Sequence, residues 1–324
     1  MTPSLATILR DNPSSRAFIL VRLLAIPFWG LFHLLPVILL KEFGVAPFMI
    51  ALLTAIKPMS ALIAPYWSHA VHQHHEKIVA NIFWAHLLKF IPFLFFPWVE
   101  SPIWILVAFA LFMILNRGTI PAWMEFLRQN VPGLSQEKTF AFSSAIDYIG
   151  TALIPLSFGW LLDTTPDAWR WLFPLTALIG LFSAFLLPKE KLFQRPVTWQ
   201  KHPLHPFKSA LSLLKQRSDF LHFQIGFMLG GAGLMLMHPA LPQLFVNTFQ
   251  LSYTEMLLAL CFCKGVGFAF SSPAWVKLFH RLPIFPFSAL VTLFAALFPL
   301  ILFSGHIHIA YILYGIMQAG SEMS

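Results

Sequence analysis

Long apolar segments follow one another along the chain from residue 17 to the C-terminus, with only short polar stretches between most of them. A membrane-spanning helix needs about 20 mostly apolar residues, which is close to the length of these segments. Apolar and polar residues do not alternate within them, as the strands of a membrane β-barrel would require. The pattern predicts ten helices, at residues 17–40, 44–67, 78–98, 102–122, 139–162, 170–187, 220–246, 254–279, 284–304 and from 306 onward.

Composition places the chain in a lipid bilayer. Hydrophobic residues make up 58% of the chain and charged residues 10%, and the mean hydropathy is +0.73, which is outside the range of soluble domains. The first apolar segment is too long for a cleavable signal peptide and is followed directly by a second span, so we expect it to stay in the membrane. We therefore predict an all-α integral membrane protein that crosses the bilayer many times.

Lysine and arginine residues fall almost entirely on one side of this predicted topology. That side holds fourteen of them: Arg10, Arg16, Lys77, Arg128, Lys138, Lys189, Lys191, Arg195, Lys201, Lys208, Lys215, Arg217, Lys277 and Arg281. The opposite side holds only Lys41 and Arg170. Because cytoplasmic loops keep basic residues, we predict a cytoplasmic N-terminus in a multi-pass protein of the bacterial inner membrane. The same asymmetry accounts for the net charge of +8 without a nucleic-acid partner.

The chain carries an internal repeat. Its landmarks recur in order at offsets of 206, 207, 208 and 208 residues: Pro36, Lys57, Pro65 and Trp67, then Pro242, Lys264, Pro273 and Trp275. Matching landmarks at a nearly constant distance predict two halves built on one plan. We expect a six-helix N-terminal bundle at residues 1–187, a basic cytoplasmic linker at 188–219, and a four-helix C-terminal bundle at 220–324.

Part of the linker has amphipathic spacing. Phe207, Leu211 and Leu214 share one helical face beside Lys208 and Lys215. This pattern is typical of a short helix that lies on the membrane surface. A solvated linker helix fits the same spacing, so both interpretations stay open.

These features together resemble the major facilitator superfamily. Besides the repeat, three local patterns carry the similarity: Trp169-Arg170-Trp171-Leu172-Phe173 opening the sixth helix, Asn130-Val131-Pro132 after the fourth, and Gly150, Pro155 and Gly159 along the fifth. The resemblance implies two pseudo-symmetric helical bundles related by an axis along the membrane normal, with a cytoplasmic central loop. Members of this family have twelve spans, so the resemblance also implies a product truncated after its tenth helix.

The loop after the second helix departs from the family pattern. The family has a glycine, an Asp-Arg pair and further basic residues there, whereas this chain has Ala64, Ser68 and His69 near those positions, followed by a histidine-rich run. The charge network that this loop forms in the family is therefore in question. The imidazoles of His69, His72, His74 and His75 suit a metal ion, but a short solvated loop lacks fixed geometry, so we predict no metal site.

Six charged residues and three histidines lie inside the predicted spans: Arg22, Lys57, Lys89, Arg117, Asp147 and Lys264, with His33, His86 and His238. Each charge at the middle of the bilayer costs roughly 2.5 to 3.5 kcal/mol on insertion scales, so such residues normally face a wet cavity or a partner. The charged set thus contains five cationic residues and one carboxylate. We predict that these residues line a substrate-binding cavity, which Lys57 and Lys264 approach from the two halves.

Several of these residues have a structural alternative. Arg22 and Arg117 lie near the cytoplasmic helix ends, from which they could reach lipid phosphates. Asp147 is interpreted most simply as the partner of Arg117 or another cation, and otherwise as a coupling residue. Histidines in such positions are more often hydrogen-bonded core residues than proton carriers. The three lysines are too central to reach the headgroups easily.

The leading hypothesis is a secondary active transporter, or permease, that moves a small anionic solute by alternating access. Lys57, Lys89 and Lys264 would balance its phosphate or carboxylate groups as movable point charges. The alternative is a transport-inactive truncated permease, or a permease-like sensor or scaffold. The sequence has no convincing set of catalytic residues for an enzyme and no Gly-rich ATP-binding loop. We expect no cofactor, and no partner besides the solute and the lipid bilayer.

Overall fold

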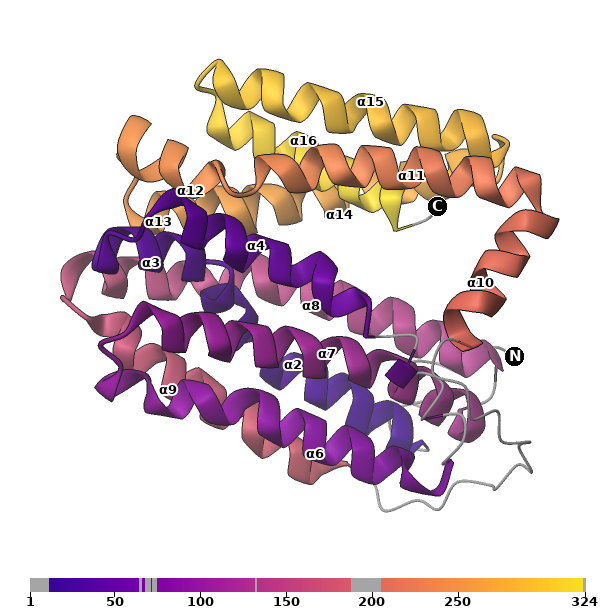
Figure 1. Cartoon of the computed structure of the whole chain (residues 1–324), viewed down its shortest axis with the longest axis horizontal. Helices are drawn as coiled ribbons and strands as arrows, with labels where there is room; N and C mark the ends of the chain where they lie inside the picture. The colour runs from indigo at the N-terminus through magenta and orange to yellow at the C-terminus, as the bar shows by residue number, and fades with distance from the viewer. Residues whose placement is uncertain are drawn as a thin grey trace. The chain divides into compact units, whose positions relative to one another are not determined.

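The computed structural model describes residues 12–63, 66–67, 71, 75–131, 133–187 and 205–322. Within these ranges the chain is helical and contains no β-strand (Figure 1). A helix lies in each of the ten predicted segments. The all-α prediction is therefore confirmed.

The helices of the first six predicted segments, in order, are α2 (Pro13–Phe32) with α3 (Leu35–Phe43), α4 (Pro47–Ala61), α6 (Ile78–Phe90) with the 3₁₀ segment η2 (Ile91–Trp98), α7 (Pro102–Asn130), α8 (Gly133–Thr164), and α9 (Ala168–Phe182) with the 3₁₀ segment η3 (Ser183–Leu186). The linker contains α10 (His205–Gln216). The last four predicted segments contain α11 (Ser218–Met237) with α12 (Leu241–Gln243) and the π-helical η4 (Leu244–Thr248), then α13 (Tyr253–Leu257) with the π-helical η5 (Leu258–Cys263) and α14 (Lys264–Phe279), then α15 (Ile284–Phe303) and α16 (Ile307–Ser321).

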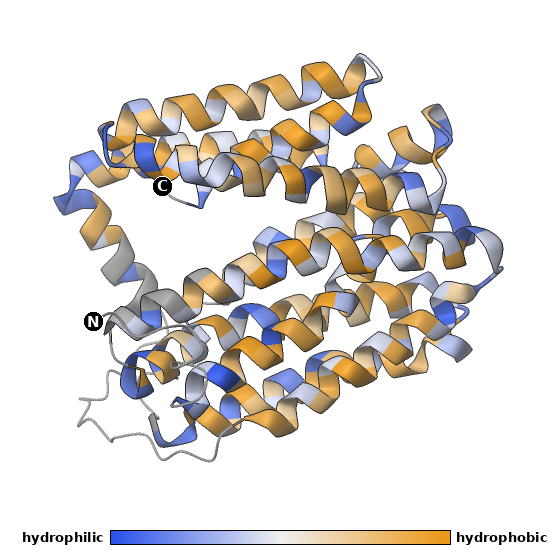
Figure 2. Ribbon diagram, turned by 180° about the vertical axis from the view of Figure 1, so that it is seen from behind, coloured by the Kyte–Doolittle hydropathy of each residue, from blue (hydrophilic) through white to orange (hydrophobic). Residues whose placement is uncertain are grey.

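Eight helical stretches of the described chain are long and apolar enough to cross a membrane. Hydrophobic residues run along most of their length (Figure 2). The other two predicted spans correspond to α4 and α16, which have 15 residues each. At 1.5 Å per residue such a helix is about 22 Å long, shorter than a hydrocarbon core of about 30 Å.

The first long stretch bends between α2 and α3. Pro36 lies in the first turn of α3, where its missing N–H leaves no intrahelical donor unsatisfied. At the other end, Gly44 adopts φ 58°, and its N–H donates to the Leu40 carbonyl. A left-handed residue at this position satisfies a free helix carbonyl, and glycine adopts it without steric penalty. Residues 44–46 therefore form a short turn before α4.

Contacts group the chain into two compact units. The first contains residues 1–28, 52–146 and 169–216, and the second contains residues 29–51, 147–168 and 217–324. Each is considered below by itself. The second unit thus takes segments from both sides of the linker, while the predicted division at residues 188–219 stays a prediction.

An aromatic cluster fills the core of the first unit. Phe28 on α2 is fully buried. The centroid of its ring lies 4.9 Å from that of Phe90, 4.8 Å from that of Phe93, 4.9 Å from that of Phe112 and 6.0 Å from that of Phe173. Most of these pairs meet edge to face, the arrangement that the ring quadrupole favours. One side chain thereby joins α2 to α6, η2, α7 and α9.

Replacing Phe28 by alanine is expected to destabilise the protein by about 3 to 5 kcal/mol, the usual cost of a large cavity in a packed core. The thermal unfolding midpoint of the purified protein in detergent should fall by several degrees. Phe48→Ala is the matched control, because Phe48 is 77% exposed. Equal midpoints for the two variants would contradict a packing role for Phe28.

The second unit is held together by close contact between its last helices. Trp275 on α14 packs against Phe287 on α15, with ring centroids 5.3 Å apart. A Cβ at Gly320 of α16 would lie 3.0 Å from the Trp275 ring. Small residues allow this approach where lipid offers no hydrophobic driving force. The result is a compact group of three helices, α14, α15 and α16.

Candidate functional site

Lys89 lies in the last turn of α6 and is 4% exposed. Its Nζ donates to Oδ1 of Asn116 on α7 over 3.2 Å. The same nitrogen lies 5.1 Å from the ring centroid of Phe90 and 5.4 Å from that of Phe112. Aromatic faces stabilise a cation through their quadrupole but do not neutralise its charge. Within the described part of the chain, this ammonium contacts a neutral amide and two rings, and no carboxylate.

His86 lies one turn before Lys89 and is 3% exposed. Its Nε2 donates to the Gly180 carbonyl over 3.1 Å and lies 2.7 Å from Oγ of Ser183. Ser183 in turn donates to the same carbonyl over 2.6 Å. These bonds join α6 to α9 and η3 and occupy the imidazole in the core of the first unit.

The other two predicted histidines are half-buried and bond to their own helices. Nδ1 of His33 donates to the Trp29 carbonyl over 2.6 Å, and Nδ1 of His238 donates to the Leu234 carbonyl over 2.7 Å. Both bonds reach back four residues, so each ring lies along the helix wall.

Lys264 is half-buried at the junction between η5 and α14. Its ammonium makes no hydrogen bond or ion pair with any other residue that the structure describes, although the charge of Glu322 acts on it. π-Helical segments such as η5 are frequent at functional sites because they displace the side chains that follow. One turn further on, the Phe268 ring stacks on Tyr148 of α8, with centroids 3.4 Å apart and planes at 11°.

A hydrogen-bond network lies beside Lys264 in the second unit. The Tyr148 hydroxyl donates to Oε1 of Glu322, and Nε2 of Gln318 donates to the Tyr148 oxygen over 3.2 Å and to Glu322 over 3.4 Å. This fixes the orientation of the Gln318 amide, because its N–H groups must face the two acceptors. Oε1 of Gln318 is then buried without a hydrogen-bond donor among the described residues. The network therefore contains an unsatisfied acceptor oxygen, and its carboxylate acts on the Lys264 charge without a direct ion pair among the described residues.

The remaining predicted residues are less enclosed. Lys57 on α4, Arg22 on α2 and Asp147 on α8 are half-buried, and Arg117 on α7 is exposed. The Arg22 guanidinium lies 5.5 Å from the Phe18 ring centroid. Lys57 and Arg117 belong to the first unit, and Lys264 and Asp147 to the second. The predicted approach of the two lysines and the predicted Asp147–Arg117 pair therefore stay predictions.

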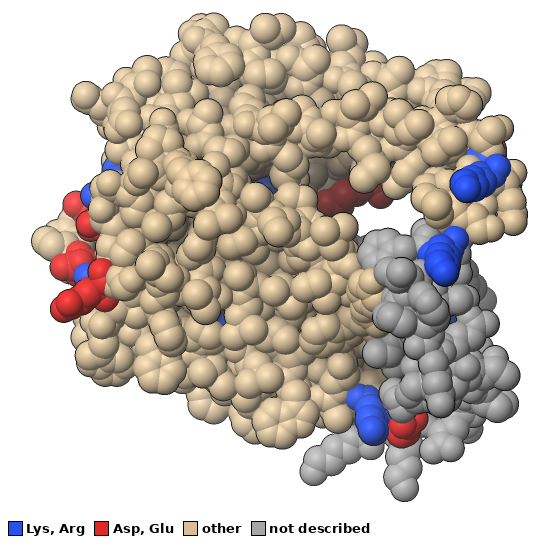
Figure 3. Space-filling model, in the orientation of Figure 1, with Lys and Arg blue, Asp and Glu red and all other residues tan. Residues whose placement is uncertain are grey.

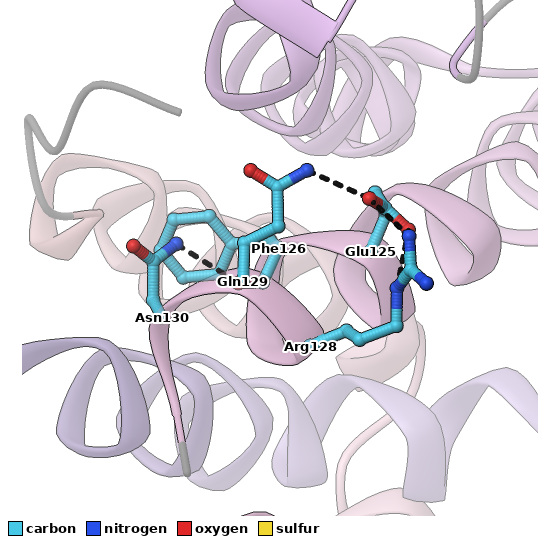
Figure 4. A network of polar contacts seen from close by, with 5 residues as sticks. All are labelled: Glu125, Phe126, Arg128, Gln129 and Asn130. Atoms are coloured by element: carbon cyan, nitrogen blue, oxygen red, sulfur yellow. Dashed lines mark hydrogen bonds and ion pairs between the residues drawn. The ribbon is translucent and has the colours of Figure 1, made fainter. Parts of the chain in front are cut away.

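Glu125 is a buried carboxylate outside the predicted set. It lies on α7, is 4% exposed, and accepts from Nε and Nη2 of Arg128 over 2.9 and 2.8 Å and from Nε2 of Gln129 over 2.7 Å (Figure 4). The spacing of three and four residues places all three on one side of the helix. The prediction ended this helix at residue 122, but α7 continues to Asn130. Glu125 therefore lies within the helix, with its charge balanced by a partner one turn away.

A metal site receives no support from the described residues, which contain no group of three or more histidine, cysteine or acidic side chains placed to hold an ion. His69, His72 and His74 of the histidine-rich loop lie outside the described residues. Cys261 and Cys263 are buried thiols on η5.

A comparison with protein families decides the identity of the fold. The family model of the Major Facilitator Superfamily matches residues 17–324. The chain belongs to the major facilitator superfamily. The resemblance seen in the repeat and the local motifs is thereby confirmed, and with it an integral, multi-pass membrane protein of a transporter family.

Solved structures agree with this assignment at the level of the fold. The nucleoside transporter NupG, as a mutant, aligns with a TM-score of 0.70 and 13% identity over 94% of this chain and 80% of its own. A bacterial homologue of the human lysosomal transporter Spinster, inward-facing and unoccupied, aligns with a TM-score of 0.64 and 15% identity over 96% and 74%. A mutant peptide transporter POT in complex with alafosfalin aligns with 0.62 and 14% over 95% and 80%. A sequence comparison with curated proteins found no match.

Proposed function

We propose that this member of the major facilitator superfamily is a secondary transporter that moves a small anionic solute by alternating access. Lys264 carries the proposal, because its half-buried ammonium lies in a membrane helix without an acceptor among the described residues. A charge in that position needs compensation beyond the charge of Glu322, which acts on it without a direct ion pair. A carboxylate or phosphate on the solute would supply it, and would leave with the solute.

The surroundings of Lys264 support binding of a small polar molecule. The backbone beside it is held by α16, because a Cβ at Gly315 would overlap the Lys264 carbonyl oxygen. Lysine combines this fixed backbone with a flexible side chain that can follow a moving anion. The unsatisfied Oε1 of Gln318 would accept a hydrogen bond from a hydroxyl or a protonated oxygen of the same solute. Unmade hydrogen bonds of buried groups cost about 1 to 3 kcal/mol, which a ligand can recover.

The repeat extends the proposal to the first half of the chain. Lys57 occupies the position equivalent to Lys264, and Lys89 adds a second buried cation with only neutral described contacts. We place residues 1–187 and 220–324 in two halves that rock about the solute, with the N-terminus and the linker in the cytoplasm. Exchange of anions, or coupling through a histidine, fits this set better than proton coupling through Asp147, because cations outnumber acids within the spans.

The proposal depends on the negative charge of the solute. Pairs of ligands that have similar size but differ in charge test it. Purified protein in detergent would be heated with lactate and lactamide, and with glycerol 3-phosphate and glycerol. A bound ligand raises the unfolding midpoint in proportion to its occupancy of the folded state. We expect at least one anion to raise the unfolding midpoint and its neutral partner to leave the midpoint unchanged. We also expect counterflow of that anion in proteoliposomes.

Equal shifts with the charged and the neutral partner would contradict the anionic assignment. A shift without counterflow would contradict transport while leaving anion binding in place.

A further inference from the structure

One end of the second unit carries a cluster of polar contacts that the proposed solute site does not use. It joins the end of α3 and the end of α8, which precede the linker, to the start of α13, which follows it. All of these residues belong to the second unit. Charged side chains gather at this end, whereas most of the visible face is uncharged (Figure 3).

Asp163, in the last turn of α8, is the centre of the cluster. Its Oδ1 accepts from the backbone N–H of Tyr253 over 2.7 Å, and its Oδ2 accepts from the backbone N–H and the hydroxyl of Thr254 over 2.9 and 2.6 Å. The first N–H groups of a helix have no partner within it and carry a partial positive charge. A carboxylate from another helix that accepts from them forms a short, charge-assisted link.

Residues of α3 support the same segment from another side. Nζ of Lys41 donates to the Leu251 carbonyl over 2.8 Å and lies 4.4 Å from the Tyr253 ring centroid. The Tyr253 hydroxyl donates to Oε1 of Glu42 over 2.7 Å. Lys41 is one of only two basic residues on its predicted side of the membrane, and this contact gives it a structural use there.

The backbones also touch at this point. A Cβ on Gly159 of α8 would lie 2.7 Å from the Thr254 Cα, so glycine is needed for the two segments to meet. Further along, a Cβ on Gly265 would lie 2.7 Å from the Ala152 side chain. Ala152, at the second of these contacts, is 7% exposed.

We propose that the Asp163 cap on α13, with the Lys41 and Tyr253 contacts, is a latch that holds this end of the solute path closed. The proposal rests on the alternating access proposed above, since segments before and after the linker must part there for a solute to pass. The loops at this end carry the few basic residues of the predicted non-cytoplasmic side, so the latch closes the path from that side. Its hydrogen bonds join a carboxylate to backbone N–H groups, and the nearby charge of Lys41 adds to the attraction.

Alkylation of a cysteine introduced at Ala152 tests the latch without any solute, because Ala152 is covered at the contact between α8 and α14. Ala152→Cys in a background with Cys261→Ser and Cys263→Ser leaves a single thiol, and the rate of its reaction with a maleimide would be measured in purified protein. We expect Asp163→Ala to raise that rate about tenfold, which corresponds to about 1.4 kcal/mol of favoured opening. Asp163→Asn, which keeps one acceptor oxygen, is expected to give a smaller increase and serves if the alanine variant does not fold.

Glu255→Ala is the matched control. Glu255 accepts from the Ser252 N–H in a capping box at the same helix start, but this bond stays within one segment. Loss of the Glu255 carboxylate should change the labelling rate at position 152 less than twofold. An unchanged rate in folded Asp163→Ala or Asp163→Asn protein would overturn the latch, and so would equal increases in the Asp163 and Glu255 variants. Failure of the anion experiments would leave this result intact, because the labelling uses no solute.

Discussion

Replacing Gly315 by alanine is expected to leave little folded protein. Gly315 of α16 lies against the backbone of α14, where an added Cβ would overlap the Lys264 carbonyl oxygen and lie 2.8 Å from the Phe268 nitrogen. The two atoms belong to a helix backbone, which cannot rotate away as a side chain can. A reciprocal contact lies one turn earlier on α16, since a Cβ on Gly267 of α14 would overlap the carbonyl oxygen of Ile312 on α16. The helices must therefore separate, and overpacking of this kind costs more than the usual 1 to 3 kcal/mol.

Size-exclusion profiles and thermal unfolding of the variant in detergent provide the measurement. Gly231→Ala is the control, because no atom lies within 4 Å of a Cβ built at Gly231 of α11. Alanine there should be neutral or slightly stabilising, since it favours the helix by up to about 1 kcal/mol over glycine. A monodisperse Gly315→Ala protein with an unchanged midpoint would show that the α14–α16 contact is looser than described.

The positions of the helices could be predicted from the sequence because the bilayer imposes one dominant rule. A segment of about 20 apolar residues must cross it as a helix, and charged loops mark the turns. Helix ends followed a different rule. The prediction ended the fourth helix at residue 122, where hydropathy falls, whereas α7 continues to Asn130 because backbone hydrogen bonds and the Glu125–Arg128 pair do not require apolar residues. The π-helical segments η4 and η5 leave no mark in hydropathy.

The charged and polar residues of the candidate site could be predicted from the sequence, but the residues that they contact could not. A lysine in an apolar span is visible in the sequence, so Lys89 and Lys264 could be selected without coordinates. The bond between His86 and Ser183 joins residues 97 apart, and it follows from how α6 packs on η3. Asp163 was missed because it lies just beyond the predicted fifth helix, where an acid normally signals only a loop. Tyr148 and Glu322 gained importance only from their contact with Gln318.

Lys264→Gln is expected to weaken binding and reduce uptake of the anion that the paired-ligand experiment identifies. Hydrogen bonds to charged groups contribute about 1.5 to 3 kcal/mol, so affinity should fall by about ten- to a hundredfold. The unfolding midpoint without ligand should stay equal or rise, because a neutral amide is easier to bury in a membrane helix than an ammonium. Reduced uptake with retained stability separates a role in solute binding from a role in folding.

Lys277→Gln is the matched control for Lys264→Gln. Lys277 is exposed in the last turn of the same helix, so its loss removes the same charge from α14 at a distance from the proposed site. Adding Lys57→Gln to Lys264→Gln should remove any residual uptake, since the repeat places an equivalent cation in the other half. Uptake by the double variant at the parental rate would mean that the anion is compensated elsewhere. In that case, Lys89 would be the next residue to test, because its described contacts also leave its charge without a counterion.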